Sequence, residues 1–330
     1  MSAKISLANS DCVVTGGAGA IGSRLTRLLL AQGAGRVVVI DDLSSGHAWL
    51  LPQDPRLEFH QVDVNRLVEH PLATPGAMIF HLAAFFANQN SVDHPLDDLH
   101  TNARGTLATL LWADQQHAAR LVYASAGCSI AGHGIDGPIS ENMPVSLHLD
   151  TPYQITKALG EFYCNYFLPR LPTVRCRFFN SYGPGEVPGP YRNVIPNFIW
   201  RALHHQPLII TGTGEETRDF IYVDDLVQAL LTAAERSEAV GMAFNLGTGV
   251  QTRIGDLAEW VIAACGSRSR IEFAPRRSWD HSTHRQADIT RARLRLGLES
   301  RVGVREGLER SVAWFREHAT AIAAAAGVAR

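Results

Sequence analysis

A tyrosine and a lysine lie four positions apart in the segment TPYQITKALGE, as Tyr153 and Lys157. This spacing places both side chains on one face of a helix. A phenol with an ordinary pKa of about 10 is a poor base at neutral pH, but a neighbouring ammonium favours the phenolate. The chain has only one other lysine, Lys4, so Lys157 suits a role that needs a compact ammonium. An ordinary surface pair at helical spacing is the alternative interpretation.

A second group of chemically useful residues follows a short apolar run in LVYASAGCSIAG, residues 121–132. The strand predicted there ends in small residues, which leave room for a ligand to approach the backbone. Ser125 and Ser129 offer hydroxyls and Cys128 offers a thiol. An inert, buried cysteine is the alternative interpretation of Cys128.

A glycine-rich turn follows the first predicted strand in VVTGGAGAIGS, with Gly16, Gly19 and Gly22. Glycine permits a tight turn and the close approach of a pyrophosphate, while the next helix presents free N–H groups at its start. Asp41 ends the second strand, where a carboxylate accepts hydrogen bonds from an adenosine ribose and disfavours the 2′-phosphate of NADP. Asp63, after the third strand, is predicted either to reach the adenine amine or to cap the strand end.

Short apolar runs alternate with amphipathic stretches through the first half of the chain, which predicts an α/β fold with a parallel sheet covered on both faces. The predicted strands are residues 12–15, 36–40, 57–61, 77–81, 121–125 and 173–179. The predicted helices are residues 23–31, 95–116, 153–168, 223–236, 253–265 and 304–318. Asp224 is expected to cap the helix that starts at residue 223. From about residue 183, glycine and proline become dense and the elements shorter, so we expect a second, smaller lobe.

Composition excludes several classes of protein. The 330 residues are 46% hydrophobic, enough for a large core, and the formal net charge of −2 gives no basic surface for nucleic acid. No apolar run reaches the roughly 18 residues that a membrane helix requires. The start of the chain lacks the apolar core of a signal peptide. Five scattered cysteines show no metal-ligand spacing, so we expect a cytoplasmic protein without a metal site.

The glycines are spaced Gly-x-x-Gly-x-x-Gly, and the chain resembles the extended short-chain dehydrogenase/reductase superfamily, in the branch that acts on nucleotide sugars. FHLAAFF (80–86), HTNARGT, TPYQITKALGE, RFFNSYGPGE, ETRDFIYVDDL and FNLGTG are similar to signatures of that branch. The resemblance runs nearly from end to end. It implies a Rossmann-type doubly wound sheet that binds NAD over residues 1–180 and 222–248. It also implies a smaller C-terminal α/β lobe that binds a nucleotide sugar over residues 181–221 and 249–330.

The resemblance also implies roles for individual residues. Tyr153 and Lys157 would be catalytic and would also contact NAD. The other residues implied to bind NAD are Gly16, Gly19, Ala20, Ile21, Gly22, Asp41, Asp42, Asp63, Val64, Leu82, Ala83, Ala84 and Asn102. Those implied to bind the nucleotide sugar are Phe86, Phe179, Asn180, Asn193, Val194, Arg218, Arg277, Asp280 and Arg285. One of the neighbouring arginines 276 and 277 is expected to be simply solvated.

The strand end at 121–132 departs from the pattern of similar enzymes. In those enzymes a Ser or Thr five residues before a glycine bridges the sugar and the tyrosine. If Gly132 is that glycine, the hydroxyl position is Gly127, and the usual tyrosine is Ala131. We therefore expect Ser125 to face the sugar, with Ser129 as the other candidate. A related C3/C5 epimerase carries a catalytic cysteine where Cys128 stands.

C4 epimerisation of a UDP-hexose or UDP-hexuronic acid, through a transient 4-keto sugar, is the reaction expected from this resemblance. Dehydratases of the family need an acid pair where this chain has Cys128 and Ser129, and decarboxylases usually carry a Glu nearby that this chain lacks. Both reactions are therefore less expected than epimerisation. A C3/C5 epimerase that uses Cys128, a decarboxylase, a 4-keto reductase and a non-catalytic dinucleotide sensor remain as alternatives. Relatives pair through two helices per subunit, so residues 95–116 and 153–168 are expected to form a homodimer interface.

Overall fold

The first strand, β1 (Asp11–Thr15), shows how the sequence builds the main sheet. Its adjacent residues Val13 and Val14 are both buried but lie in cores on opposite faces of the sheet, because successive side chains of a strand alternate. The computed structural model describes residues 5–127, 131–132, 135 and 137–327. Apolar side chains on both faces are typical of a parallel strand covered by helices on each side.

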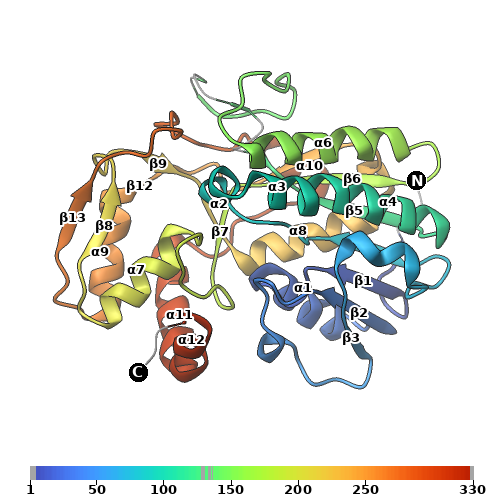
Figure 1. Ribbon diagram of the computed structural model, residues 1–330, viewed down its shortest axis with the longest axis horizontal. Helices are drawn as coiled ribbons and strands as arrows, with labels where there is room; N and C mark the ends of the chain where they lie inside the picture. Colours follow the sequence, from blue (N-terminus) through green and yellow to red (C-terminus); the bar gives the residue numbers. More distant parts are fainter. Residues whose placement is uncertain (1–4, 128–130, 133–134, 136, 328–330) are drawn as a thin grey trace.

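Seven strands form this sheet in the order β11-β6-β5-β4-β1-β2-β3, and every neighbouring pair is parallel (Figure 1). The other six are β2 (Arg36–Asp41), β3 (Leu57–Gln61), β4 (Met78–His81), β5 (Arg120–Ala126), β6 (Thr173–Phe178) and β11 (Ala243–Leu246). The predicted fold class is confirmed. The order reverses between β1 and β4, and parallel sheets bind ligands at the carboxyl ends of the strands beside such a reversal.

Helices cover both faces of the sheet. One face packs against α1 (Ala20–Ala31), α8 (Val223–Glu235) and α10 (Thr290–Leu296). The other packs against the 3-10 helix η2 (Val64–Glu69), α4 (Gly105–Gln115) and α6 (Pro152–Phe167). The short helices η1 (Ala48–Leu50) and η4 (Ser237–Ala239) lie in connections between elements.

Two expected helices differ in detail from the prediction. The stretch at 95–116 is three successive segments, α3 (Pro95–Asp98), the π-helical η3 (Leu99–Arg104) and α4, preceded by α2 (Asn88–Asp93). Asp224 does not cap α8, whose N-cap residue Tyr222 makes no side-chain hydrogen bond. The Asp224 carboxylate instead forms a bidentate ion pair with Arg24, because α1 packs directly against α8.

The smaller lobe has its own apolar core, in which Phe198, Ile210, Val261 and Leu308 are buried. Its elements are α7 (Val194–Leu203), β8 (Leu208–Thr211), α9 (Ile254–Cys265), β13 (Ile271–Ala274), α11 (Val304–Glu317) and α12 (Ala319–Ala325). Two short strand pairs lie near the junction of the lobes: β7 (Asn180–Tyr182) with β10 (Phe220–Tyr222), and β9 (Thr217–Arg218) with β12 (Thr252–Arg253).

The proposed division of the chain between the lobes stays a prediction, but α10 departs from it. This helix was assigned to the C-terminal lobe, yet Ala292, Leu296 and Leu298 are buried in the core of the sheet domain. Helix α10 packs against β11 and α8. The chain therefore returns to the first lobe once more than the sequence indicated.

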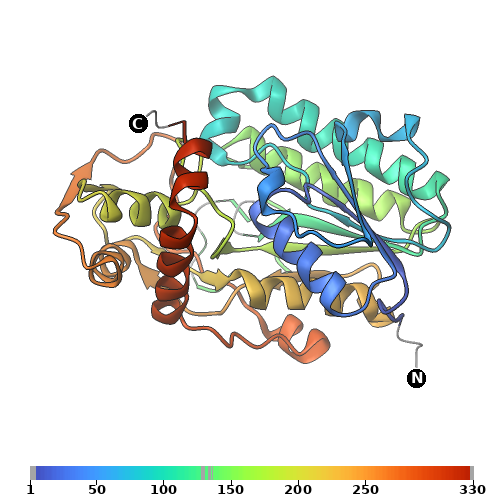
Figure 2. The same ribbon diagram turned by 90° about the horizontal axis from the view of Figure 1, so that it is seen from below.

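An aromatic stack joins the two lobes. Trp49 of η1 lies parallel to Trp314 of α11, with ring centroids 5.9 Å apart and planes inclined by 12°. His318, just after α11, stacks on Trp314 at 5.1 Å. Figure 2 shows the dark red C-terminal helices between the yellow and orange lobe and the blue start of the chain.

Within the described residues, every helix is too short or too polar to cross a lipid bilayer.

Candidate active site

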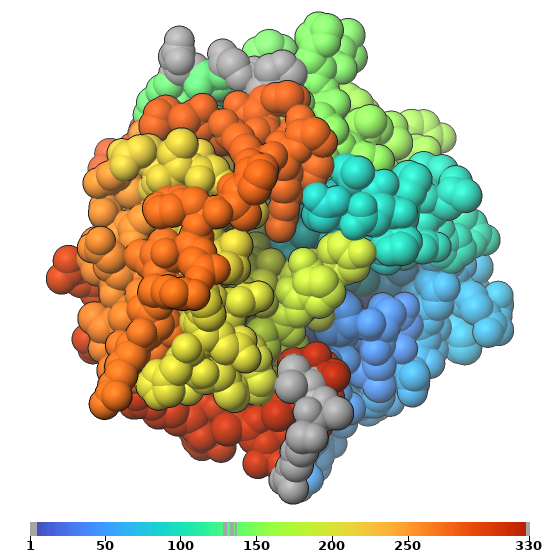
Figure 3. All heavy atoms as spheres, turned by 60° about the vertical axis from the view of Figure 1, so that its left-hand side comes forward, coloured from blue at the N-terminus to red at the C-terminus, as the bar shows by residue number. Residues whose placement is uncertain are grey.

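A cavity of about 460 Å³ lies between the two lobes. Its lining begins at the glycine-rich turn, passes Tyr153 and Lys157, and ends among arginines of the C-terminal lobe. Figure 3 shows the hollow where the orange, yellow and teal parts of the chain meet. The cavity thus brings together the three groups of residues that the sequence singled out.

Tyr153 and Lys157 lie on the inner face of α6, as their spacing predicts. Thr151 caps this helix by accepting a hydrogen bond from the Gln154 N–H, and the Tyr153 N–H donates to Ser91 Oγ at 3.0 Å. Tyr153 is 7% exposed and Lys157 is 3% exposed. Lys157 Nζ donates to the carbonyl oxygen of Ala124 at 2.9 Å and lies 5.8 Å from the centre of the Tyr153 ring. Both groups are held in place before any ligand arrives.

Burial dominates the electrostatics of Lys157 and lowers its pKa from 10.5 to about 8. The carboxylate of Asp98 opposes this shift. Asp98 is fully buried and accepts hydrogen bonds from Asn102 Nδ2 at 2.6 Å and Thr156 Oγ1 at 2.8 Å. With a pKa near 8, Lys157 is largely an ammonium at neutral pH, and its charge favours an ionised phenol nearby.

The glycine-rich turn forms a cradle without side chains at the start of α1. Gly16 has φ of +69°, and a Cβ there would lie 2.6 Å from the backbone nitrogen of Ala83. A Cβ on Gly22 would lie 2.2 Å from the Gly16 carbonyl oxygen. The first turn of α1 holds no acidic residue. The cradle therefore suits a pyrophosphate, which the free N–H groups and the helix dipole stabilise.

Asp41 lies beside this cradle. Its carboxylate accepts hydrogen bonds from the backbone N–H groups of Ala18 at 3.0 Å and Leu43 at 2.9 Å. Each oxygen retains a lone pair for a further donor. Burial raises the pKa of Asp41, and the two N–H donors oppose that shift. This position, between the glycine turn and the end of β2, suits a ribose.

The small residues at the end of β5 form the wall of the cavity next to Lys157. Ser125 lines the cavity, but its hydroxyl donates to Glu161 Oε1 at 2.6 Å, and Arg177 holds both oxygens of Glu161 at 2.8 Å. The Ser125 hydroxyl thus has a partner in Glu161, and its contact with a sugar stays a prediction. The other two candidates, Cys128 and Ser129, lie outside the described residues.

Gly127 has a steric reason to lack a side chain. A Cβ there would lie 2.7 Å from Cε2 of Phe179, a ring that is itself 4% exposed. Phe86 meets the Tyr153 ring edge-to-face at 6.1 Å. Both phenylalanines line the cavity, and Phe86 makes its wall beside Tyr153 aromatic.

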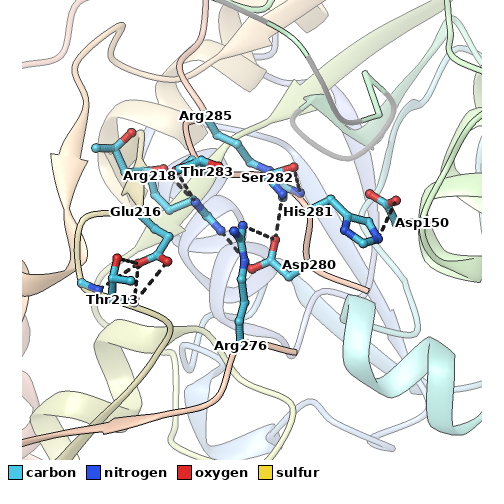
Figure 4. Close-up of polar contacts among 12 residues, drawn as sticks. Asp150, Thr213, Glu216, Arg218, Arg276, Asp280, His281, Ser282, Thr283 and Arg285 are labelled. Atoms are coloured by element: carbon cyan, nitrogen blue, oxygen red, sulfur yellow. Dashed lines mark hydrogen bonds and ion pairs between the residues drawn. The ribbon is translucent and has the colours of Figure 1, made fainter. Parts of the chain in front are cut away.

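Arginines and one aspartate line the cavity on the side of the C-terminal lobe (Figure 4). Arg218 Nη2 donates to Asp280 at 3.3 Å, and Arg276 forms an ion pair with the same carboxylate at 3.7 Å. Arg285 is 7% exposed and donates to Ser282 Oγ at 2.7 Å. Asp280 lines the cavity and binds two arginines, and its contact with the nucleotide stays a prediction. Of the two neighbouring arginines, Arg277 is the exposed one and lies over a tryptophan ring.

Three more predicted substrate residues line the same cavity: Asn180, Asn193 and Val194. Asn180 Nδ2 donates to the carbonyl oxygen of Asp219 at 3.3 Å. Asn193 Nδ2 donates to Glu186 at 2.8 Å, and burial raises the pKa of that carboxyl from 4.5 to about 7. Sequence reasoning missed Glu186, although it follows the Gly-Pro-Gly turn after Asn180 and so lies next to predicted site residues.

Comparison with known proteins decides the family. Residues 12–247 match the model of the NAD dependent epimerase/dehydratase family. The chain belongs to this family. It is 36% identical over 315 residues to the UDP-glucose 4-epimerase of Mycolicibacterium smegmatis, covering 92% of this chain and 98% of the relative. It is 30% identical over 320 residues to the UDP-N-acetyl-alpha-D-glucosaminuronate decarboxylase of Bacillus cytotoxicus, covering 93% and 98%.

Solved structures agree with the family assignment. Epimerase Mth375 of Methanothermobacter thermautotrophicus is 43% identical with a TM-score of 0.92, covering 97% of this chain and 96% of the other. Similar solved structures contain NAD. This member of the epimerase/dehydratase family is therefore an NAD-dependent enzyme that modifies nucleotide sugars, as the motifs indicated.

Several predicted NAD contacts have clear structural roles in this family member. Asp63 caps η2 by accepting from the Asn65 N–H at 2.9 Å and lies 3.5 Å from His100, which matches the capping interpretation. Asn102 is buried and bonds to both backbone groups of Phe85, so it positions the segment after β4. The predicted NAD residues that line the cavity are Gly16, Gly19, Ala20, Ile21, Gly22, Leu82, Ala84, Tyr153 and Lys157. Direct contact of NAD with Asp42, Val64 and Ala83 stays a prediction.

Proposed function

We propose that this enzyme epimerises C4 of a UDP-hexose or UDP-hexuronic acid through a transient 4-keto sugar. The observation that carries the proposal is the pairing of Tyr153 with the buried ammonium of Lys157 in the wall of the cavity. An epimerase needs little more than this, because the sugar only loses and regains one hydride, at C4, and one proton, at its 4-hydroxyl. Removal and return of the hydride are the chemistry that NAD supplies when bound.

The chain itself positions the sugar and moves one proton. Tyr153 Oη accepts the proton of the sugar 4-hydroxyl as C4 becomes a carbonyl, and returns it after the sugar has turned over. Lys157, fixed by the Ala124 carbonyl, favours the phenolate before Tyr153 accepts the proton and after it returns it. The overall reaction is an isomerisation, so it consumes no external oxidant or reductant.

The buried carboxylate of Glu161 is not available as the second acid that dehydration requires. Glu161 lies on the same helix as Tyr153, but its oxygens are occupied by Arg177 and Ser125. A dehydratase needs a second acid that is free to protonate the leaving hydroxyl. The relative that decarboxylates UDP-N-acetyl-alpha-D-glucosaminuronate makes decarboxylation the main competing reaction.

The proposal is tested by incubating the purified protein with UDP-glucose, UDP-galactose and UDP-glucuronate without added NAD. Interconversion of C4 epimers, followed by NMR or chromatography, is the expected result. Tyr153→Phe should lower kcat by about 10²- to 10⁴-fold. Release of CO₂ would identify a decarboxylase, and consumption of added NADH a reductase. Tight NAD binding without turnover of any sugar would identify a sensor.

We also propose a homodimer that pairs α4 and α6 of each subunit. Large apolar side chains lie exposed along these helices: Leu111, Ile155, Phe162 and Tyr166 are 41% to 65% exposed. Burial of such side chains against a second copy would form a four-helix contact. Sedimentation of the purified protein tests this, and a monomer at micromolar concentration would contradict it.

A further inference from the structure

One hydrogen bond connects the two lobes across the cavity. Trp279 Nε1 donates to Gln89 Oε1 at 2.8 Å, although the two residues are 190 positions apart. Gln89 lies in the first turn of α2, three residues after Phe86, and its Nε2 donates to Asp93 Oδ1 at 2.9 Å. The amide of Gln89 is therefore held with its oxygen toward the indole. Both Gln89 and Trp279 line the cavity.

Trp279 belongs to the segment that carries the arginine cluster, residues 276–285, which we call the arginine segment. The Arg277 guanidinium lies 5.8 Å from the centre of the Trp279 ring. The next residue, Asp280, holds Arg218 and Arg276. A restraint on Trp279 is thus passed to three arginines. In Figure 3 the orange part of the chain reaches the teal region above the hollow, and Figure 4 shows the cluster itself.

The same segment lacks regular secondary structure between β13 and α10. Without a fixed point on the first lobe, such a connection samples many positions, and ligand binding must then order it at a cost in affinity. The bond to Gln89 supplies such a fixed point three residues from Phe86, in addition to the contact of His281 with Asp150 at 4.0 Å.

We propose that the Trp279–Gln89 hydrogen bond is a clasp that positions the arginine segment for the diphosphate of a nucleotide sugar. This proposal rests on the proposed substrate class. Trp279 and Gln89 are positioning residues, since neither needs to touch a reacting atom. The clasp should therefore act on the binding of substrate and of UDP, and leave the chemical step nearly unchanged.

The test compares Trp279→Phe, which keeps an aromatic ring but lacks the N–H, with Gln89→Leu and with the double variant. Each single variant should raise KM for the nucleotide sugar and Kd for UDP about three- to tenfold, with kcat within about twofold of the wild type. The double variant should be no worse than either single variant, because both remove one interaction. Trp260→Phe is the matched control: Trp260 also carries an arginine on its ring, Arg305 at 4.6 Å, but lies outside the cavity lining.

Four outcomes would overturn the clasp. Unchanged UDP binding in Trp279→Phe, when the wild type binds UDP, would reject it and leave the proposed reaction intact. Multiplicative losses in the double variant would show two independent contacts. A loss in kcat alone would place Trp279 in the chemistry. If the wild type fails to bind UDP, both the proposed substrate class and the clasp are wrong. Thermal unfolding of each variant shows whether the fold is retained.

Discussion

Lys157→Met is expected to make the NAD-free protein more stable while it abolishes activity. The reason is that the Lys157 ammonium is buried where an apolar side chain would lie more favourably. Lys157 is 3% exposed, and methionine has a similar length, no branch and no charge. The variant exchanges a functional charge for packing, which is the usual conflict between stability and activity at catalytic sites.

The size of the effect follows from the pKa. Burial lowers the pKa of Lys157 from 10.5 to about 8, and each unit corresponds to about 1.4 kcal/mol, so the buried ammonium costs about 3 kcal/mol. Loss of the hydrogen bond to the Ala124 carbonyl returns about 1 kcal/mol of this. At pH 7 the variant should thus be more stable by roughly 2 kcal/mol.

The sign of the pH dependence is fixed by the direction of the shift. Because the folded-state pKa lies below the unfolded-state value, the wild type carries the full cost below about pH 8. The cost fades as pH rises toward 10.5, where the unfolded chain also loses its proton. The difference between variant and wild type should therefore shrink by about 2 kcal/mol between pH 7 and pH 9.5.

The assay is urea unfolding of NAD-free wild type and variant at both pH values, since bound cofactor would stabilise the two proteins unequally. Tyr153→Phe is the control that removes activity and leaves the ammonium. A variant less stable than the wild type at pH 7, with a difference that does not change with pH, would refute the reasoning.

Three further results are expected. Gly127→Ser should lower the free energy of unfolding by about 1–3 kcal/mol, because its Cβ would meet the Phe179 ring at 2.7 Å. Adding Phe179→Leu should restore part of this in urea titrations, and an equal loss in both backgrounds would contradict the steric explanation. Asp41→Ser should weaken NAD binding and narrow its preference over NADP, as measured by fluorescence titration; an unchanged ratio would exclude Asp41 as the discriminating group. The wild type should lose stability as pH rises from about 4.5 to 7, because the Glu186 carboxyl ionises in the unfolded chain before it does in the folded protein. Glu186→Gln should remove this loss. Parallel stability curves of the Gln variant and wild type at pH 5 and 8 would argue against this.

Local patterns were enough to predict the sheet and the cofactor end of the site. The strand–helix alternation, the glycines after β1 and Asp41 after β2 each depend on neighbours within one β-α-β unit, so spacing along the chain carries their geometry. The same holds for Tyr153 and Lys157, which share one helix face.

The sequence could not show hydrogen bonds and ion pairs between side chains of elements far apart in the chain. The direction of the Ser125 hydroxyl depends on Glu161 of α6 and Arg177 of β6. Asp224 left its expected capping position because α1 brings Arg24 to it. Such contacts appear only once the helices are packed on the sheet. Trp279 was missed for the same reason, since its partner lies in the other lobe.

The stacked rings of Trp49, Trp314 and His318 pack helix α11 against the loop that follows β2. Trp49 follows shortly after Asp41. The loop that is predicted to contact the adenosine therefore packs against a helix some 260 residues later. A chain that ended before α11 would keep all seven parallel strands and still leave that loop without its backing. If this loop contacts the dinucleotide, affinity for NAD should depend on α11 as well as on the Rossmann domain.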